Sequence, residues 1–140
     1  NPLLHGEIST INNFFDIKNN LDSKNYIFFS THEPCSLCLS AITWAGFNNF
    51  YYFFPYLDTK DKFSISHDLN IMSEVFKIDQ GKYNVHYSYW KSFSIIDEVS
   101  KLSIENKEEL QLKIDKIYKE YEILSFKYQQ NKSKNKIPLN

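Results

Sequence analysis

Two short runs of aromatic and β-branched residues, "YIFFST" (26–31) and "FYYFF" (50–54), flank a segment of helical character. Short apolar runs of this kind predict buried strands. The intervening "CSLCLSAITWAG" (35–46) fits a helix, with Pro34 at its start and Gly46 as its C-terminal stop. Strands that alternate with helices are typical of an α/β layer with a mostly parallel sheet.

The same alternation continues on both sides of this unit. Apolar residues recur at helical spacing near the start of the chain and again after residue 68. The further expected elements are a helix from Leu4 to Ile17, a polar loop at 19–25, a helix over 69–76, a third strand at 83–90 and a helix at 92–102. Together they predict one α/β domain over residues 1–105.

Residues 106–140 differ in character. Asn106, with Glu109 three positions later, resembles a capping box at a helix start. An apolar stripe with alternating steps of three and four comes next, at Leu110, Ile114, Ile117, Tyr121 and Leu124. We expect this helix and its polar tail to pack on the same domain, with a subunit contact through the stripe as the alternative.

Composition excludes several classes of protein. With 140 residues, 42% of them hydrophobic, the chain is long enough for one domain with its own core. A net charge of −1 gives no basic surface for nonspecific nucleic-acid binding. No apolar run approaches the roughly 18–20 residues that cross a bilayer, and no signal-peptide pattern opens the chain. Only two cysteines occur, which favours a reducing, cytoplasmic location over a secreted disulfide framework.

Those two cysteines, Cys35 and Cys38, point to specific chemistry. Residues three apart on a helix share one face, so both sulfurs can reach one ion. A position in the first helical turn lowers a thiol pKa and favours the thiolate that zinc binds. A catalytic zinc then needs one more protein ligand and keeps its fourth position for water. A redox pair is the alternative use of this spacing.

His5 is the best candidate for the third ligand, because it also precedes a predicted helix. Ligands in open α/β sheets collect where the strands end, so two helix starts can point at one spot there. Glu7 lies two residues on, roughly 200° round a helix. This direction suits a side chain that touches a zinc-bound water rather than the metal.

The pattern H-x-E followed by P-C-x-x-C is the signature of zinc nucleobase deaminases. Through "HGEIST" and "EPCSLCLSAI", residues 2–17 and 26–54 resemble the cytidine deaminase-like superfamily, in its branch of cytosine, guanine and tRNA adenosine deaminases. The resemblance implies a three-layer α/β/α fold with a mixed, mostly parallel sheet. In that family a helix and two strands precede the H-x-E helix. We therefore expect residues 1–140 to lack these elements and to be the C-terminal portion of a longer protein.

The resemblance also implies the roles of the site residues. His5, Cys35 and Cys38 would bind Zn²⁺, and Glu7 would be the catalytic proton shuttle. The implied reaction is hydrolytic deamination of a nucleobase or nucleoside. In it, zinc-bound hydroxide attacks the carbon that bears the amine, and ammonia leaves. A structural zinc is the alternative, but it leaves a glutamate two residues after the histidine unexplained.

The substrate stays open between two types. "HGEIST" favours cytosine or cytidine, whereas "EPCSLCLSAI" followed by Trp44 favours guanine. A net charge of −1 counts against a tRNA substrate, even with the Lys-rich tail at 127–136. A catalytically silent partner subunit of the same fold is the alternative from another class.

Several other features carry open interpretations. The resemblance implies a homodimer formed through the ligand-bearing helices, with Trp44 as either the anchor of that contact or ordinary core. His32 stands where relatives commonly carry an apolar residue, and it either lines the pocket or faces a neighbouring helix. The run at 50–54 offers a ring to stack on a base, although core packing is the commoner role. "HDLNIMSEVF" (67–76) and "YSYW" (87–90) are candidates for closing the pocket.

Overall fold

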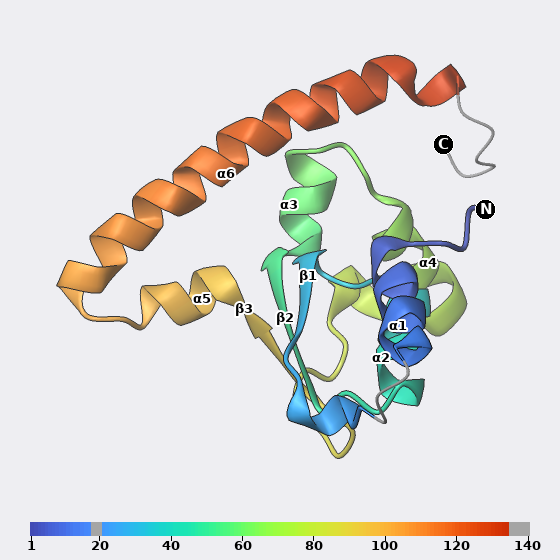
Figure 1. Ribbon diagram of the computed structural model, residues 1–140. Helices are drawn as coiled ribbons and strands as arrows, with labels where there is room; N and C mark the ends of the chain where they lie inside the picture. The colour runs from blue at the N-terminus through green and yellow to red at the C-terminus, as the bar shows by residue number, and fades with distance from the viewer. Residues whose placement is uncertain (18–20, 135–140) are drawn as a thin grey trace.

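The computed structural model describes residues 1–17 and 21–134, in which helices and strands alternate (Figure 1). The helices are α1 (Gly6–Asp16), α2 (Ser36–Trp44), α3 (Tyr56–Asp61), α4 (His67–Phe76), α5 (Ile95–Ser100) and α6 (Ile104–Asn131). The strands are β1 (Phe28–His32), β2 (Asn49–Phe54) and β3 (Lys91–Ser94). Short 3-10 turns occupy Ser23–Asn25, Asp79–Gly81 and Lys132–Lys134. The predicted loop residues 19–20 and tail residues 135–140 lie outside the described part of the chain.

The three described strands form one sheet in the order β1-β2-β3, and every pairing is parallel. Phe29 is in register with Tyr51, and Tyr51 in turn with Phe93. Parallel neighbours need a crossover, and α2 supplies it between β1 and β2. The prediction of an α/β fold with a mostly parallel sheet is confirmed.

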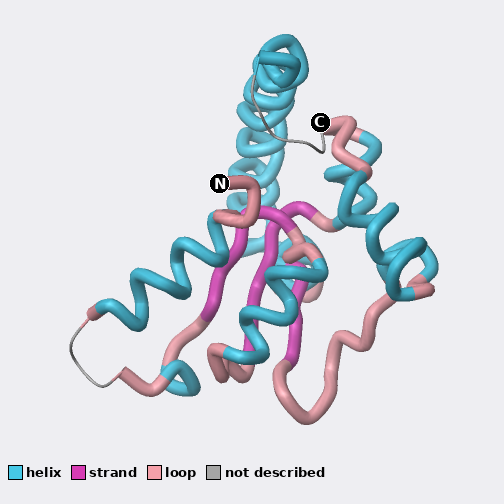
Figure 2. Tube along the Cα trace, turned by 90° about the vertical axis from the view of Figure 1, so that its right-hand side faces the viewer, coloured by secondary structure: helices cyan, strands magenta, loops and turns pink. Residues whose placement is uncertain are grey.

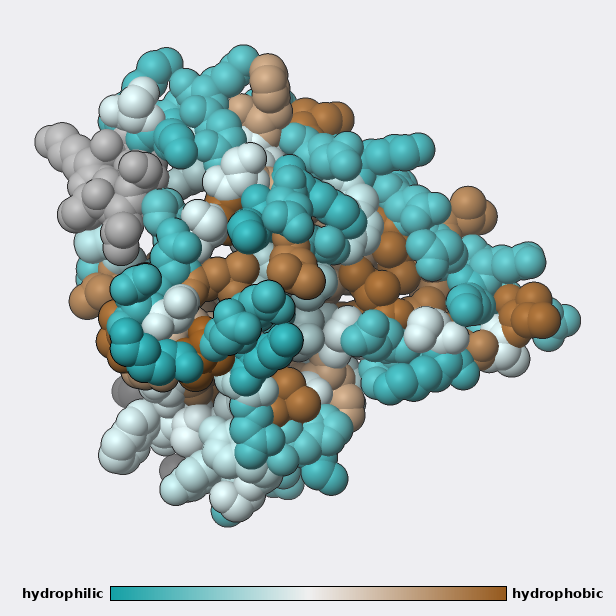
Figure 3. Space-filling view, turned by 180° about the vertical axis from the view of Figure 1, so that it is seen from behind, coloured by the Kyte–Doolittle hydropathy of each residue, from teal (hydrophilic) through white to brown (hydrophobic). Residues whose placement is uncertain are grey.

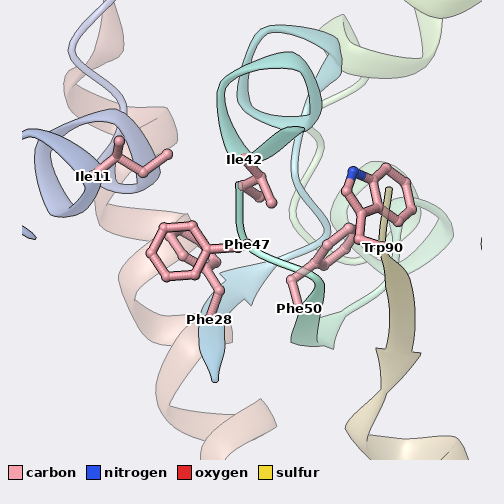
Figure 4. Close-up of a cluster of buried hydrophobic side chains, with 6 residues drawn as sticks. All are labelled: Ile11, Phe28, Ile42, Phe47, Phe50 and Trp90. Carbon is pink, nitrogen blue, oxygen red and sulfur yellow. The ribbon is translucent and has the colours of Figure 1, made fainter. Parts of the chain in front are cut away.

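Helices lie on both sides of the sheet, as the two perpendicular views show (Figure 1 and Figure 2). Helices α1 and α2 cover one face, where six residues form an aromatic core (Figure 4): Ile11, Phe28, Ile42, Phe47, Phe50 and Trp90. Alternate residues of β1 follow the period of two, because Phe28 and Ser30 are buried whereas Phe29 is exposed. Each fully buried ring stabilises this layer by about 1.5–3 kcal/mol.

Helix α6 packs against the other side. Ile114 is buried there with residues of β2, α5 and the α3–α4 connection: Phe53, Phe54, Phe63 and Val99. Most of the predicted stripe contacts this cluster, through Leu110, Ile117 and Tyr121. Leu124 does not, and it is 55% exposed. The stripe therefore joins α6 to the sheet over most of its length.

Other large apolar side chains of α6 remain exposed, among them Leu112, Ile123 and Phe126. Hydrophobic surface interrupts the hydrophilic surface on the face seen from behind (Figure 3). No helix in the described part of the chain combines the length and the hydropathy that a membrane span requires.

The prediction of a third strand at 83–90 was wrong. That segment is irregular apart from one bridge between His86 and Lys91, and the strand is β3 at Lys91–Ser94. Its aromatic rings pack on one another, as Tyr87 does on Trp90 at 4.6 Å, instead of joining a ladder. The helix expected at 92–102 therefore starts only at Ile95, where the Ser94 hydroxyl accepts a hydrogen bond from Asp97 N at 3.3 Å.

Two helix starts also differ from expectation. Helix α6 begins at Ile104 after Ser103, so Asn106 and Glu109 lie inside the helix and form no capping box. Pro34 does not occupy the first helical position of α2, because Cys35 is the extended N-cap residue between them. Gly46 ends α2 as predicted, with a φ of 77°.

Candidate metal centre

Two helix starts bring the predicted ligands together. His5 is the N-cap residue of α1 and Cys35 is the N-cap residue of α2, both with extended backbone. Cys38 lies in the first turn of α2, fully buried. Strand β1 ends just before Cys35, so this group lies beyond the carboxyl end of the sheet, as expected for an α/β layer.

The distances among the three donor atoms fit a tetrahedral ion. Cys35 Sγ lies 3.4 Å from His5 Nδ1 and 3.5 Å from Cys38 Sγ, and Cys38 Sγ lies 3.6 Å from the same nitrogen. Bonds of zinc to sulfur and nitrogen at tetrahedral angles require about 3.8 Å between sulfurs and about 3.6 Å between sulfur and nitrogen. The donor set therefore fits zinc to within a few tenths of an ångström.

The two thiols share a hydrogen bond that separates their acidities. This bond lowers the pKa of Cys35 to about 6, and it raises the pKa of Cys38, as does burial. The lowered pKa of Cys35 favours the thiolate form that zinc binds. Because zinc binds cysteines as thiolates, zinc binding also releases the proton of Cys38.

Glu7 lies beside the three donor atoms but is not itself one of the proposed metal ligands. Its Oε1 accepts a hydrogen bond from Ser30 Oγ at 2.7 Å, and its Oε2 accepts one from Cys38 Sγ at 3.4 Å. Ser30 is a buried residue of β1 that was not among the predicted site residues. The available signal was a hydroxyl within an aromatic strand, at a position that the strand period directs toward the core.

A pocket of about 430 Å³ opens onto this group. Its lining residues come from α1, β1, the β1–α2 connection and α4: His5, Gly6, Glu7, Thr10, Phe29, Ser30, Thr31, His32, Glu33, Cys35 and Asp68. Asp68 belongs to the segment 67–76 that the sequence suggested as a pocket wall. The other suggested segment, 87–90, lines a different hollow.

The polar walls of the pocket are partly desolvated. Burial raises the pKa of the Asp68 carboxyl, although the charge of His5 opposes this shift. Phe53 and Phe54 of the run 50–54 point into the core, so that run contributes no ring to the pocket. The exposed ring in the pocket is Phe29.

Both alternatives for His32 are correct: it lines the pocket and it also faces a neighbouring helix. It lines the pocket, and its ring packs on Phe54 at 5.1 Å, Phe63 at 5.9 Å and Tyr121 of α6 at 5.4 Å. Burial lowers the pKa of its imidazole, so the ring is neutral at neutral pH. Trp44, by contrast, is not ordinary core, because 91% of its surface is exposed.

Comparison with known proteins agrees with this geometry. Residues 1–54 match the family model of the cytidine and deoxycytidylate deaminase zinc-binding region. The matched span contains His5, Glu7, Cys35 and Cys38. No curated protein matches the chain, and no solved structure matches it.

Proposed function

We propose that this chain, whose residues 1–54 match the family model of the cytidine and deoxycytidylate deaminase zinc-binding region, is a zinc-dependent hydrolase that deaminates a nucleobase or nucleoside. The substrate is of the cytosine/cytidine or guanine type. The main support is one arrangement: a His5–Cys35–Cys38 donor set with the Glu7 carboxylate 3.4 Å from one of its sulfurs.

In this proposal His5 Nδ1 and the Sγ atoms of Cys35 and Cys38 hold the metal. When bound, zinc acidifies a coordinated water and so supplies a nucleophile at neutral pH. Cys35 and Cys38 begin α2, whose positive dipole end stabilises both thiolates. Their burial keeps bulk water from competing for the sulfurs.

Glu7 moves the protons. Its carboxylate accepts a proton from the attacking water and delivers it to a ring nitrogen as the C–O bond forms, then carries the second water proton, from the new hydroxyl, to the exocyclic amine as the C–N bond breaks. The net reaction consumes one water, replaces the amine with a carbonyl oxygen and releases ammonia. Deprotonation of Cys38 removes the S–H that Glu7 Oε2 accepts from, which leaves this oxygen free to take the proton.

Ser30 holds Oε1, the other oxygen of the Glu7 carboxylate, in place. Its hydroxyl donates to Glu7 Oε1 at 2.7 Å from a buried strand, so Oε2 keeps a defined direction. A proton carrier held in place loses less entropy on reaching the reactive geometry.

The pocket walls suit a flat, polar base. Phe29 offers an apolar ring, whereas Asp68 and the neutral His32 offer groups that pair with ring N–H and amine positions. A net charge of −1 favours a small substrate over tRNA, because phosphate contacts need a concentrated basic face.

The test is ammonia release by zinc-loaded protein from cytosine, cytidine, guanine and adenosine. We expect turnover of at least one of the first three, and Glu7→Gln to lower it by about 10²–10⁴-fold while the variant still binds one zinc. Glu122→Gln, which changes an exposed carboxylate of α6, is the matched control. Absence of turnover with all four would contradict the proposal and favour a silent partner subunit.

A further inference from the structure

Glu33 is a buried carboxylate that the proposed reaction does not use, although it stands two residues before Cys35. We propose that Glu33 is a positioning residue for the cysteine ligands. It acts through the connection between β1 and α2, and touches neither metal nor substrate. This role rests on the proposed zinc site and adds to it a residue that positions the ligands without binding the metal.

The backbone of Glu33 is fixed to the sheet. Its N–H donates to Phe54 O at 2.8 Å, one residue beyond the last register pair of β1 and β2, His32 with Phe54. The parallel pairing therefore continues up to the residue that precedes Pro34.

The side chain of Glu33 connects two other segments. One oxygen, Oε2, accepts the backbone N–H of Tyr56 at 2.9 Å, and Oε1 accepts the Tyr83 hydroxyl at 2.8 Å. Burial raises the pKa of both phenols, so Tyr56 and Tyr83 remain protonated donors at neutral pH. Both carboxylate oxygens are thus engaged inside the protein, although the residue borders the pocket.

Tyr56 holds the connection at a second point. Its hydroxyl donates to Pro34 O, while its backbone N–H donates to Glu33. Gly81 makes room for this ring: a Cβ there would lie 2.6 Å from Tyr56 Cδ2, and its φ of 68° already disfavours other residues. Glu33 and Pro34, the two residues before Cys35, are therefore held by hydrogen bonds to the sheet, to α3 and to the segment around Tyr83.

This arrangement has a direct consequence for metal binding. A metal site needs its donor atoms held within about 0.5 Å of the productive geometry. Cys35 is the N-cap residue of α2, and its side chain makes no capping hydrogen bond, so its position depends strongly on the residues that precede it. Loss of Glu33 leaves Tyr56 N–H and the Tyr83 hydroxyl without their acceptor in a buried place, and the connection relaxes.

The experiment compares zinc affinity, by competition with a chelator, in the whole chain and in Glu33→Ala and Glu33→Gln. We expect Glu33→Ala to weaken zinc binding by about tenfold or more, the range found for partners outside the ligand set. Glu33→Gln keeps an acceptor for Tyr56 N–H and should restore part of the loss. Cobalt substituted for zinc should show altered d–d absorption in Glu33→Ala, because the ligand geometry changes.

Thr43→Val is the matched control, since it removes a partly buried hydrogen bond between side chains, from Trp90 Nε1 to Thr43 Oγ1 at 2.8 Å, at the far end of α2. A control variant that keeps wild-type zinc affinity supports a positioning role for Glu33.

Equal affinity in wild type and both Glu33 variants overturns the inference while leaving the proposed function intact. Equal loss in Thr43→Val and Glu33→Ala also overturns it, because the effect is then general destabilisation. If Glu33→Ala does not fold, Glu33→Gln decides through the same affinity and spectrum. A wild-type chain that binds no zinc overturns both proposals.

Discussion

Ser30 Oγ donates to Glu7 Oε1 across 2.7 Å, so strand β1 and helix α1 meet at the proposed proton carrier. We predict that Ser30→Ala lowers kcat by about 10- to 100-fold, since a hydrogen bond to a charged group contributes about 1.5–3 kcal/mol. Zinc stoichiometry should stay unchanged. Ser92→Ala is the control, because Ser92 is an equally buried strand serine whose hydroxyl donates to Val85 O instead. An unchanged kcat in Ser30→Ala would show that Glu7 needs no such partner.

Zinc should stabilise the folded chain. A ligand present at 100 times its Kd raises the free energy of unfolding by about 2.7 kcal/mol. We therefore expect a higher Tm with zinc than with a chelator, measured by thermal unfolding. Cys38→Ala, which removes a fully buried donor, should abolish this difference. A shift that follows the oxidation state of the thiols and ignores zinc would favour the redox alternative.

His32 should make the free energy of unfolding depend on pH. Burial lowers its pKa below the ordinary value of 6.5, so the unfolded chain binds the proton more readily than the folded chain. Stability conferred by the neutral ring is present above pH 6.5 and is lost as pH falls below it. Relative to His32→Phe, the wild type should lose stability between pH 7.5 and about 5. Both proteins are measured by denaturant unfolding in chelator, which removes the proton release that accompanies zinc binding. A constant difference across this range would contradict the prediction.

We propose that Trp44 anchors a homodimer, because its indole is 91% exposed on the helix that carries Cys38. Leu37, seven residues earlier, lies on the same helical face and is also exposed. Trp44→Ala should weaken self-association about 30-fold or more, the size of an interface hot spot, in sedimentation equilibrium. Tyr89→Ala changes a similarly exposed ring elsewhere and should leave association unchanged. A monomeric wild type would refute the proposal.

The sequence predicted that His5, Cys35 and Cys38 lie together because each position depends on local rules. His5 and Cys35 precede helices, and Cys38 follows Cys35 at a fixed helical offset, so their convergence required only a parallel sheet. Ser30 was missed, and Asp68 was anticipated only through its segment 67–76, because their relation to the site is made by tertiary packing. Ser30 meets Glu7 across 23 positions of sequence, and no periodicity encodes that contact.

The position of the third strand was also mispredicted because tertiary pairing, and not a local pattern, determines it. Residues 92–94 fit a helical pattern together with residues 95–102, yet β3 pairs with β2 from Lys91 to Ser94. Pairing along the exposed edge of β2 outweighed the local helical preference, as tertiary context commonly does. The tyrosines before it, at 83–90, have high strand propensity, but their rings pack on one another instead of forming a ladder.

The reactive atoms of the proposed site and one part of its pocket wall come from different stretches of the chain. The residues with reactive or supporting atoms all precede residue 39, namely His5, Glu7, Ser30, Cys35 and Cys38, whereas the pocket residue Asp68 comes from α4. In the proposed deaminase, substitutions on α4 would change which base is accepted without displacing a metal donor. Selection could then diversify substrate choice while the hydrolytic chemistry is inherited unaltered, and an engineer seeking a new specificity would start at Asp68.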